Sequence, residues 1–198
     1  MNHFYFTLGP VQNFVAQARR TRDFWAGSFL LSYLTAHAMK NVQKEQGGTI
    51  VMPDVQHDEM LKTVRDGFGD GPKIGSLPNC FEADVPEVFF GEKVADAVKT
   101  EWKRIAKEVW EYDKLEAAGV NETLWGDQIK NFWEIAWVIA GPEETAAWAM
   151  RNHFPPEQLG DKCTMMGEWQ ELSGVPAPNR KTQDEFWNGV RAKNNISP

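Results

Sequence analysis

The residues best suited to chemistry lie near the start of the chain, where a short apolar segment ends at Gly9-Pro10 and a helical pattern begins at once. A turn followed by a helix start presents unpaired backbone N–H groups, and the helix dipole favours negative charge there. Polar and charged side chains follow in the same stretch: Gln12, Arg19, Arg20, Arg22, Asp23 and Ser28. The stretch is therefore a candidate site for a polar ligand.

The apolar pattern predicts the elements that must position these residues. Alternation predicts a strand at 3–8, with Phe4 and Phe6 on one face, and further strands are expected at 49–52, as a short buried strand, and at 79–85. Helical spacing predicts helices at 11–18, 23–46, 94–112 and 123–130. The segment 132–140 is a fourth strand candidate, although its periodicity fits a buried helix equally well. The segment 54–78 is loop-like, with one turn of helix expected at 59–64.

Two helices have apolar stripes that should face the core. The stripe of the second helix is Phe24, Leu30, Leu31, Leu34 and Ala38, and that of the third is Val94, Val98, Trp102, Ile105 and Val109.

The order of these elements is that of a split βαβ arrangement, so the fold class predicted is α+β. We expect a ferredoxin-like antiparallel sheet with helices on one face, formed by residues 1–141. Residues 142–198 are more polar and richer in Pro, Gly and Asn, with a further helix expected at 143–152. They predict a small, partly helical and partly irregular C-terminal appendage.

Composition limits the function classes. The 198 residues, 42% of them hydrophobic, are enough for one substantial core, and the net charge of −7 argues against a surface that binds nucleic acid throughout. A local basic patch remains open at Arg19, Arg20 and Arg22. Only two cysteines are present, Cys80 and Cys163, so a reducing compartment fits best. With no membrane-length apolar run and no signal-peptide pattern, the expected location is cytoplasmic.

Several motifs together resemble one known family. The segment 6–34 (FTLGPVQNFVAQARRTRDFWAGSFLLSYL) strongly resembles the start of the first palm-like domain in the large, polymerase-like subunit of type III-B CRISPR–Cas (Cmr) effector complexes. Three further tracts match in order: 75–79 (GSLPN) with Phe81; Trp125, Gln128, Phe132, Trp133, Glu134 and Trp137; and Lys162-Cys163 with Gly167-Glu168. The resemblance spans nearly the whole chain and implies a ferredoxin-like palm related to nucleotide cyclases.

The resemblance also shows what this sequence lacks. Full-length members carry a second palm with a Gly-Gly-Asp-Asp motif, whose carboxylates hold the divalent metals that polymerise ATP into cyclic oligoadenylate. That motif is missing here, and the nearest segment, 67–71 (GFGDG), is typical of a turn. His57-Asp58 is a lone dipeptide rather than a nuclease motif, and Cys163 lacks the second cysteine of a zinc pair.

We therefore expect no catalytic residue, no metal site and no cofactor of its own. ATP with Mg²⁺ or Mn²⁺ enters only if the chain is paired with a catalytic palm.

Within the family the first palm faces the second and ATP binds between them. The resemblance therefore implies that Gly9, Pro10, Gln12, Arg19, Arg22, Asp23 and Ser28 contribute to a nucleotide-binding wall. Gln12 would offer its amide to a base or ribose, and Arg19 and Arg22 would offer charge to phosphates. A structural alternative stays open, in which Arg22 and Asp23 form a salt bridge that orients two consecutive helices and Ser28 only packs.

Other prominent residues favour structural interpretations. For Trp125, Trp133, Trp137 and Trp148, packing in a core or subunit interface is favoured over base stacking. Leu77-Pro78-Asn79 is typical of a fixed turn that enters a strand, and Cys80 of a buried small apolar residue.

The resemblance implies a subunit or fragment of an RNA-guided antiviral complex. In that role the chain lines the ATP pocket of the cyclic oligoadenylate synthase and helps assembly, without chemistry of its own. Two alternatives remain open: half of a split synthase whose Gly-Gly-Asp-Asp palm lies on another chain, and a stand-alone nucleotide-binding module. The expected partners are other CRISPR effector subunits and, through them, guide RNA and target RNA, with ATP as a further ligand and no membrane.

Overall fold

The fold is that of a computed structural model, which describes residues 1–16, 18–67, 71–141, 158, 160–163, 169–175 and 179–193. The chain forms two compact units. The first takes in residues 1–101 together with the last strand, and the second takes in residues 102–132 together with the C-terminal part. The expected boundary at 141, the expected helix at 143–152 and Trp148 fall at or among residues outside the described part, so these stay predictions.

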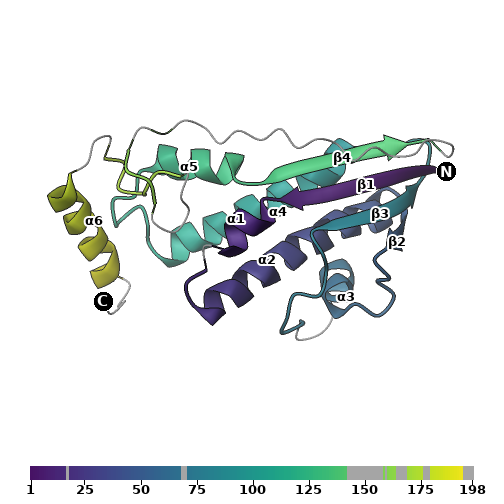
Figure 1. The fold of residues 1–198 in the computed structure, drawn as a ribbon, viewed down its shortest axis with the longest axis horizontal. Helices are drawn as coiled ribbons and strands as arrows, with labels where there is room; N and C mark the ends of the chain where they lie inside the picture. Colours follow the sequence, from purple (N-terminus) through teal and green to yellow (C-terminus); the bar gives the residue numbers. More distant parts are fainter. Residues whose placement is uncertain are drawn as a thin grey trace. The chain divides into compact units, whose positions relative to one another are not determined.

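The first unit is built on a four-stranded antiparallel sheet (Figure 1). Its strands are β1 (Asn2–Gly9), β2 (Thr49–Met52), β3 (Cys80–Val85) and β4 (Glu134–Ala140), in the spatial order β2-β3-β1-β4. β1 pairs with both β3 and β4, and β2 pairs with β3. This order and orientation are those of the split βαβ arrangement, so the predicted α+β, ferredoxin-like fold class is confirmed.

The segment 132–140, whose periodicity fits both a strand and a helix, contains strand β4. Its register against β1 explains the choice, because Ile135, Trp137 and Ile139 lie opposite Leu8, Phe6 and Phe4. Directly opposed residues in an antiparallel pair share one face of the sheet. The apolar side chains of the two strands therefore meet on the same face.

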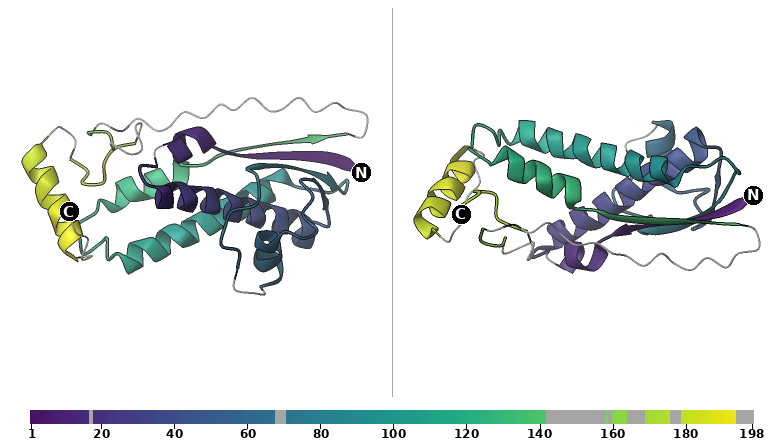
Figure 2. Two further views of the ribbon diagram at one scale, coloured as in Figure 1. Left: turned by 60° about the horizontal axis from the view of Figure 1, so that its bottom comes forward. Right: turned by 90° about the horizontal axis from the view of Figure 1, so that it is seen from above.

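Helices cover that apolar face. The helices of the first unit are α1 (Val11–Ala16), α2 (Thr21–Lys40), which continues into a π-helical turn at Asn41–Glu45, α3 (Glu59–Asp66) and the first half of α4 (Gly91–Tyr112). Both turned views place α2 and the first half of α4 on one side of the sheet (Figure 2). Phe6 stacks on Phe81 with ring centroids 4.9 Å apart, and Phe4 meets Phe89 edge-on at 4.8 Å.

Two residues of the predicted apolar stripes are exposed. Phe24 on α2 is 55% exposed and Val109 on α4 is 39% exposed, so their predicted burial was wrong. The buried residues of α2 begin only at Gly27 and extend to Met39. Cys80 is half-buried rather than fully buried. No helix among the described residues is both long and apolar enough to cross a membrane.

Helix α3 is longer than the single turn expected from the sequence. At its start the Asp58 side chain accepts a hydrogen bond from the Leu61 N–H at 2.7 Å. At its end Gly67 adopts a left-handed conformation with φ of 73°, and its N–H donates to the Thr63 carbonyl. An Asp cap and a left-handed glycine are the usual ends of a short helix.

A pH dependence of stability follows from the end of α3. Asp66 accepts hydrogen bonds from the Arg65 guanidinium, the closer at 2.8 Å, and lies 3.4 Å from Lys44 Nζ. These contacts, led by the hydrogen bonds from Arg65, hold the pKa of Asp66 below its ordinary value of 3.8. A carboxyl with a lowered folded-state pKa stabilises the fold above its unfolded value, and this stability is lost as the pH falls through the folded value.

We expect Asp66→Asn to lower the melting temperature by about 2 °C at pH 7, since a partly exposed ion pair contributes little. The difference between variant and wild type should shrink to nothing as the pH falls below the folded-state pKa. Thermal melts followed by circular dichroism from pH 2 to pH 7 measure it, with the exposed Asp96→Asn on α4 as control. A constant difference at all pH values would contradict the assignment.

The second unit contains the second half of α4, α5 (Glu122–Asn131), α6 (Arg180–Lys193) and the described parts of 158–175. α4 and α5 are joined by a hydrogen bond from Trp102 Nε1 to the Ile129 carbonyl at 3.0 Å. Gln128 on α5 donates to the Gln170 carbonyl at 2.7 Å. Trp187 on α6 donates from Nε1 to Glu171 Oε2 at 2.9 Å. Tertiary hydrogen bonds thus hold α6, a helix that the polar sequence did not predict.

Candidate nucleotide-binding site

The end of β1 is held in place by Asn79. Leu8 donates its backbone N–H to the Asn79 carbonyl at 2.8 Å, and the Asn79 side-chain amide donates to the Leu8 carbonyl at 2.8 Å. This reciprocal pair fixes the backbone immediately before Gly9. Leu77-Pro78-Asn79 is therefore a fixed turn that enters β3, as predicted from the sequence.

The loop before that turn lies tightly on α2. Ser32 Oγ donates to the Leu77 carbonyl at 2.7 Å, and Trp25 Nε1 donates to the Lys73 carbonyl at 2.9 Å. A Cβ on Gly75 would lie 2.7 Å from both the Ser28 carbonyl oxygen and Ser32 Oγ, so only glycine fits against the helix. The loop 71–79 thereby connects the N-terminal half of α2 to the end of β1.

The turn after β1 leads directly into α1. Gly9 is buried opposite Glu134 of β4, and Pro10 precedes the first residue of the helix. Phe14 on α1 meets Trp133 edge-on at 5.3 Å and lies 3.3 Å from where a Cβ on Gly27 would be. This contact packs α1 on α2. Gln12 lies in α1, and its side chain is outside the described part of the structure.

The candidate charged residues lie where α2 begins. Arg19 and Arg20 are exposed in the connection from α1, and Arg20 is the N-cap residue of α2. Arg22 is 75% exposed on its side chain and lies 3.4 Å from Asp23 Oδ1. Both residues of this pair belong to the first turn of α2, so the salt bridge does not tie two helices together as the structural alternative had it.

Ser28 lies further along α2 and is half-buried, with its carbonyl against Gly75. Two parts of the candidate site therefore lie on backbone that other residues hold in place. Gly9 and Pro10 follow the Asn79 pair, and Ser28 lies beneath the loop 71–79. Arg19, Arg22 and Asp23 lie on the chain between them, so one stretch of sequence carries positive charge and a hydroxyl.

No cluster of three or more His, Cys, Asp or Glu side chains suited to a metal ion occurs among the described residues. Cys163 lies beside an isolated antiparallel bridge between Lys162 and Gln170, and its N–H donates to the Trp169 carbonyl at 2.7 Å. The segment 67–71 lies partly outside the described residues.

Sequence reasoning did not single out a second concave region, on α4 and α5. Its lining includes Trp110 and Gly126. The sequence did contain one signal for this region, a glycine in the middle of a predicted helix. Glycine there lowers the stability of the helix, so its presence calls for an explanation.

A comparison with protein families identifies one match. The family described as CRISPR-associated protein Cmr2, N-terminal, matches residues 4–107, which are 104 of the 198 residues. These residues run from β1 into α4 and contain every candidate site residue. No curated protein matches the chain at a significant level.

Proposed function

This chain belongs to the family of CRISPR-associated protein Cmr2, and from this membership we propose that it forms the non-catalytic wall of an ATP pocket. Membership makes it a component of a type III-B CRISPR effector complex, in which other subunits are its partners. In the proposed arrangement a second palm, on the rest of a longer protein or on another chain, completes the pocket. That palm supplies the carboxylates that hold the divalent metals.

One observation carries the proposal. The end of β1 is fixed by the reciprocal Leu8–Asn79 hydrogen bonds at the point where the chain turns through Gly9-Pro10 into α1 and α2. A site that holds phosphates needs unpaired N–H donors and nearby cations, and the first turn of α2, where the N-cap residue Arg20 makes no side-chain cap hydrogen bond, offers both.

The proposed roles follow from the chemistry of each side chain. Arg22 is exposed, and its contact with Asp23 at 3.4 Å involves one of its five N–H donors, so the guanidinium retains donors for phosphate oxygens. Arg19 adds positive charge in the same connection, and Ser28 offers a hydroxyl. Gln12 would meet the base or ribose. Leu8 and Gly9 stand where an active palm holds a metal carboxylate, which favours a wall rather than a metal-binding half.

ATP affinity of the assembled effector tests the proposal. We expect Arg22→Ala to weaken ATP binding about tenfold, because the variant loses a charge-assisted hydrogen bond to phosphate. The matched control is Arg20→Ala, which removes the same charge from a neighbouring exposed position. Titration calorimetry with a non-hydrolysable ATP analogue measures both affinities.

Equal losses of ATP affinity in the two variants would show that the effect comes from net charge alone. They would contradict a specific contact between Arg22 and phosphate. Cyclic oligoadenylate made from ATP and Mg²⁺ or Mn²⁺ by the purified chain alone would overturn the non-catalytic assignment.

A further inference from the structure

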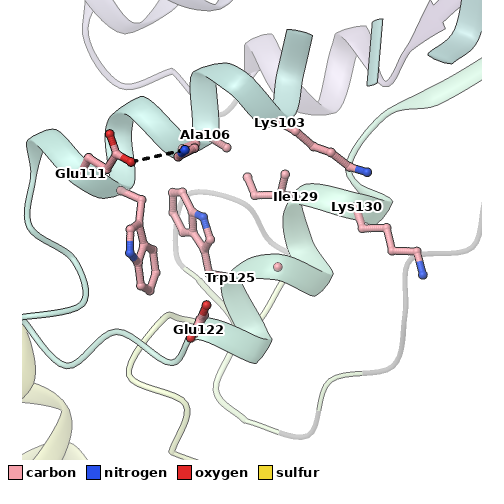
Figure 3. A pocket seen from close by; sticks show the side chains of 10 residues that line it. Lys103, Ala106, Glu111, Glu122, Trp125, Ile129 and Lys130 are labelled. Carbon is pink, nitrogen blue, oxygen red and sulfur yellow. Dashed lines mark ion pairs between the residues drawn. The ribbon is translucent and has the colours of Figure 1, made fainter. Parts of the chain in front are cut away.

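A groove lies in the second unit between the second half of α4 and α5 (Figure 3). Its volume is about 490 Å³. The floor is apolar: Trp110 and Trp125 have ring centroids 5.8 Å apart, and Ile129 lies beside them in the lining. α5 has no fully buried residue, although Trp125 and Ile129 are large and apolar. Among the described residues, these two helices therefore leave an aromatic surface uncovered along their junction.

Gly126 lies in the wall of this groove, and no contact among the described residues explains why this position is a glycine. It lies in the middle of α5, where glycine costs about 1 kcal/mol relative to alanine. A Cβ built there would meet nothing within 4 Å, so no contact with the described residues requires its absence. A helix position without a side chain does allow the backbone of another element to approach closely.

The charges around the groove have opposite signs at its two ends. Figure 3 shows Lys103 and Lys130 at one end and Glu111 and Glu122 at the other. Lys107 lies 3.7 Å from Glu111, which leaves the outer two lysines as the cationic end. Three lysines and two glutamates line the groove, so its formal charge is only +1. A polyanion such as RNA would meet two carboxylates here, whereas a segment with acidic and basic ends fits.

We propose that this groove receives an amphipathic α-helix of another protein subunit of the effector complex. An apolar side chain of that helix lies over Trp125 and Ile129, and its backbone crosses Gly126. Its acidic residues face Lys103 and Lys130, and its basic residues face Glu111 and Glu122. Tryptophans in the centre with charges at the rim are the usual composition of such an interface. The inference rests on membership of a multi-subunit family and is independent of the ATP pocket.

The first test places a bulky side chain in the groove. We expect Gly126→Leu, introduced into the co-expressed effector complex, to reduce co-purification of one protein subunit at least tenfold. The matched control is Gly189→Leu in α6 of the same unit, where a Cβ also meets nothing within 4 Å. Circular dichroism melts of both purified variants report folding. Both should melt at or above the wild-type temperature, because leucine is a better helix former than glycine.

Charge reversal provides a second variant that does not depend on side-chain bulk. Lys103→Glu combined with Lys130→Glu should weaken association of the same subunit and make it less sensitive to salt. Unchanged assembly of both variants would overturn the proposal. So would binding of a labelled single-stranded RNA by the chain alone that Gly126→Leu abolishes, since the occupant would then be nucleic acid.

Discussion

Replacement of Phe6 by alanine is expected to lower the free energy of unfolding by about 3–5 kcal/mol. Phe6 has no exposed surface and lies in β1, the strand that pairs with both β3 and β4. Its ring stacks on Phe81 and lies 6.3 Å from the ring of Phe4. Truncation would therefore open a cavity lined by rings on a rigid sheet, which cannot collapse to fill it.

Urea unfolding followed by far-ultraviolet circular dichroism measures this loss as a lower midpoint for the first unit. The matched control is Phe24→Ala, which removes the same side chain from a position that is 55% exposed. We expect the control to change stability by less than about 1 kcal/mol. Equal effects of the two substitutions would show that Phe6 does not belong to the core.

Gly75→Ala should give the second large effect, a loss of about 1–3 kcal/mol from overpacking. The added methyl group would lie 2.7 Å from the Ser28 carbonyl oxygen and 3.0 Å from the Phe29 Cα. Both are backbone atoms of α2, so they cannot rotate away as a flexible side chain would. The loop 71–79 must therefore lift from the helix and strain the Ser32–Leu77 hydrogen bond.

Chemical denaturation measures the loss, and Gly126→Ala is the matched control. The control adds the same methyl group where nothing lies within 4 Å, so it should leave stability unchanged or raise it by up to about 1 kcal/mol. If Gly75→Ala behaved like Gly126→Ala, the close contact between loop and helix would be wrong. In the proposed pocket, Gly75→Ala should also weaken ATP binding, because the lifted loop lies against Ser28 and ends at Asn79, which holds the end of β1.

Strands β1 and β3 could be predicted because their signals are local, whereas the expected burial of β2 was wrong, since Val51 and Met52 are exposed at the edge of the sheet. Alternation of Phe4, Phe6 and Leu8 with polar or small neighbours marks a half-buried strand, and β3 shows the same pattern. Periodicity also shows which residues share one side of a helix, but not where along the helix its packing partner ends. Phe24 was therefore misassigned, since α2 has no buried residue before Gly27.

The error at Val109 has a different cause. The first half of α4 buries Val94 and Val98 in the first unit, whereas in its second half Trp110 packs against Trp125 of α5. Different sides of α4 are therefore packed in its first and second halves. A prediction of one continuous apolar stripe cannot describe such a helix.

The candidate site could be predicted only where its signal was local. Gly9-Pro10 and the following charges are visible in the sequence as a turn before a helix. The Asn79 side chain, by contrast, reaches the Leu8 carbonyl across 71 positions of sequence. No spacing rule predicts such a contact, because it depends on β1 and β3 being neighbours in the sheet.

The strand order has a consequence for synthesis of the protein. β1 leaves the ribosome before both of its partners, which are β3 at 80–85 and β4 at 134–140. Phe4, Phe6 and Leu8 therefore stay unpaired until much of the chain has been translated. Pairings so distant in sequence form slowly, and apolar strands exposed meanwhile are prone to aggregate. The growing chain should thus be a client of chaperones that shield exposed apolar segments during translation.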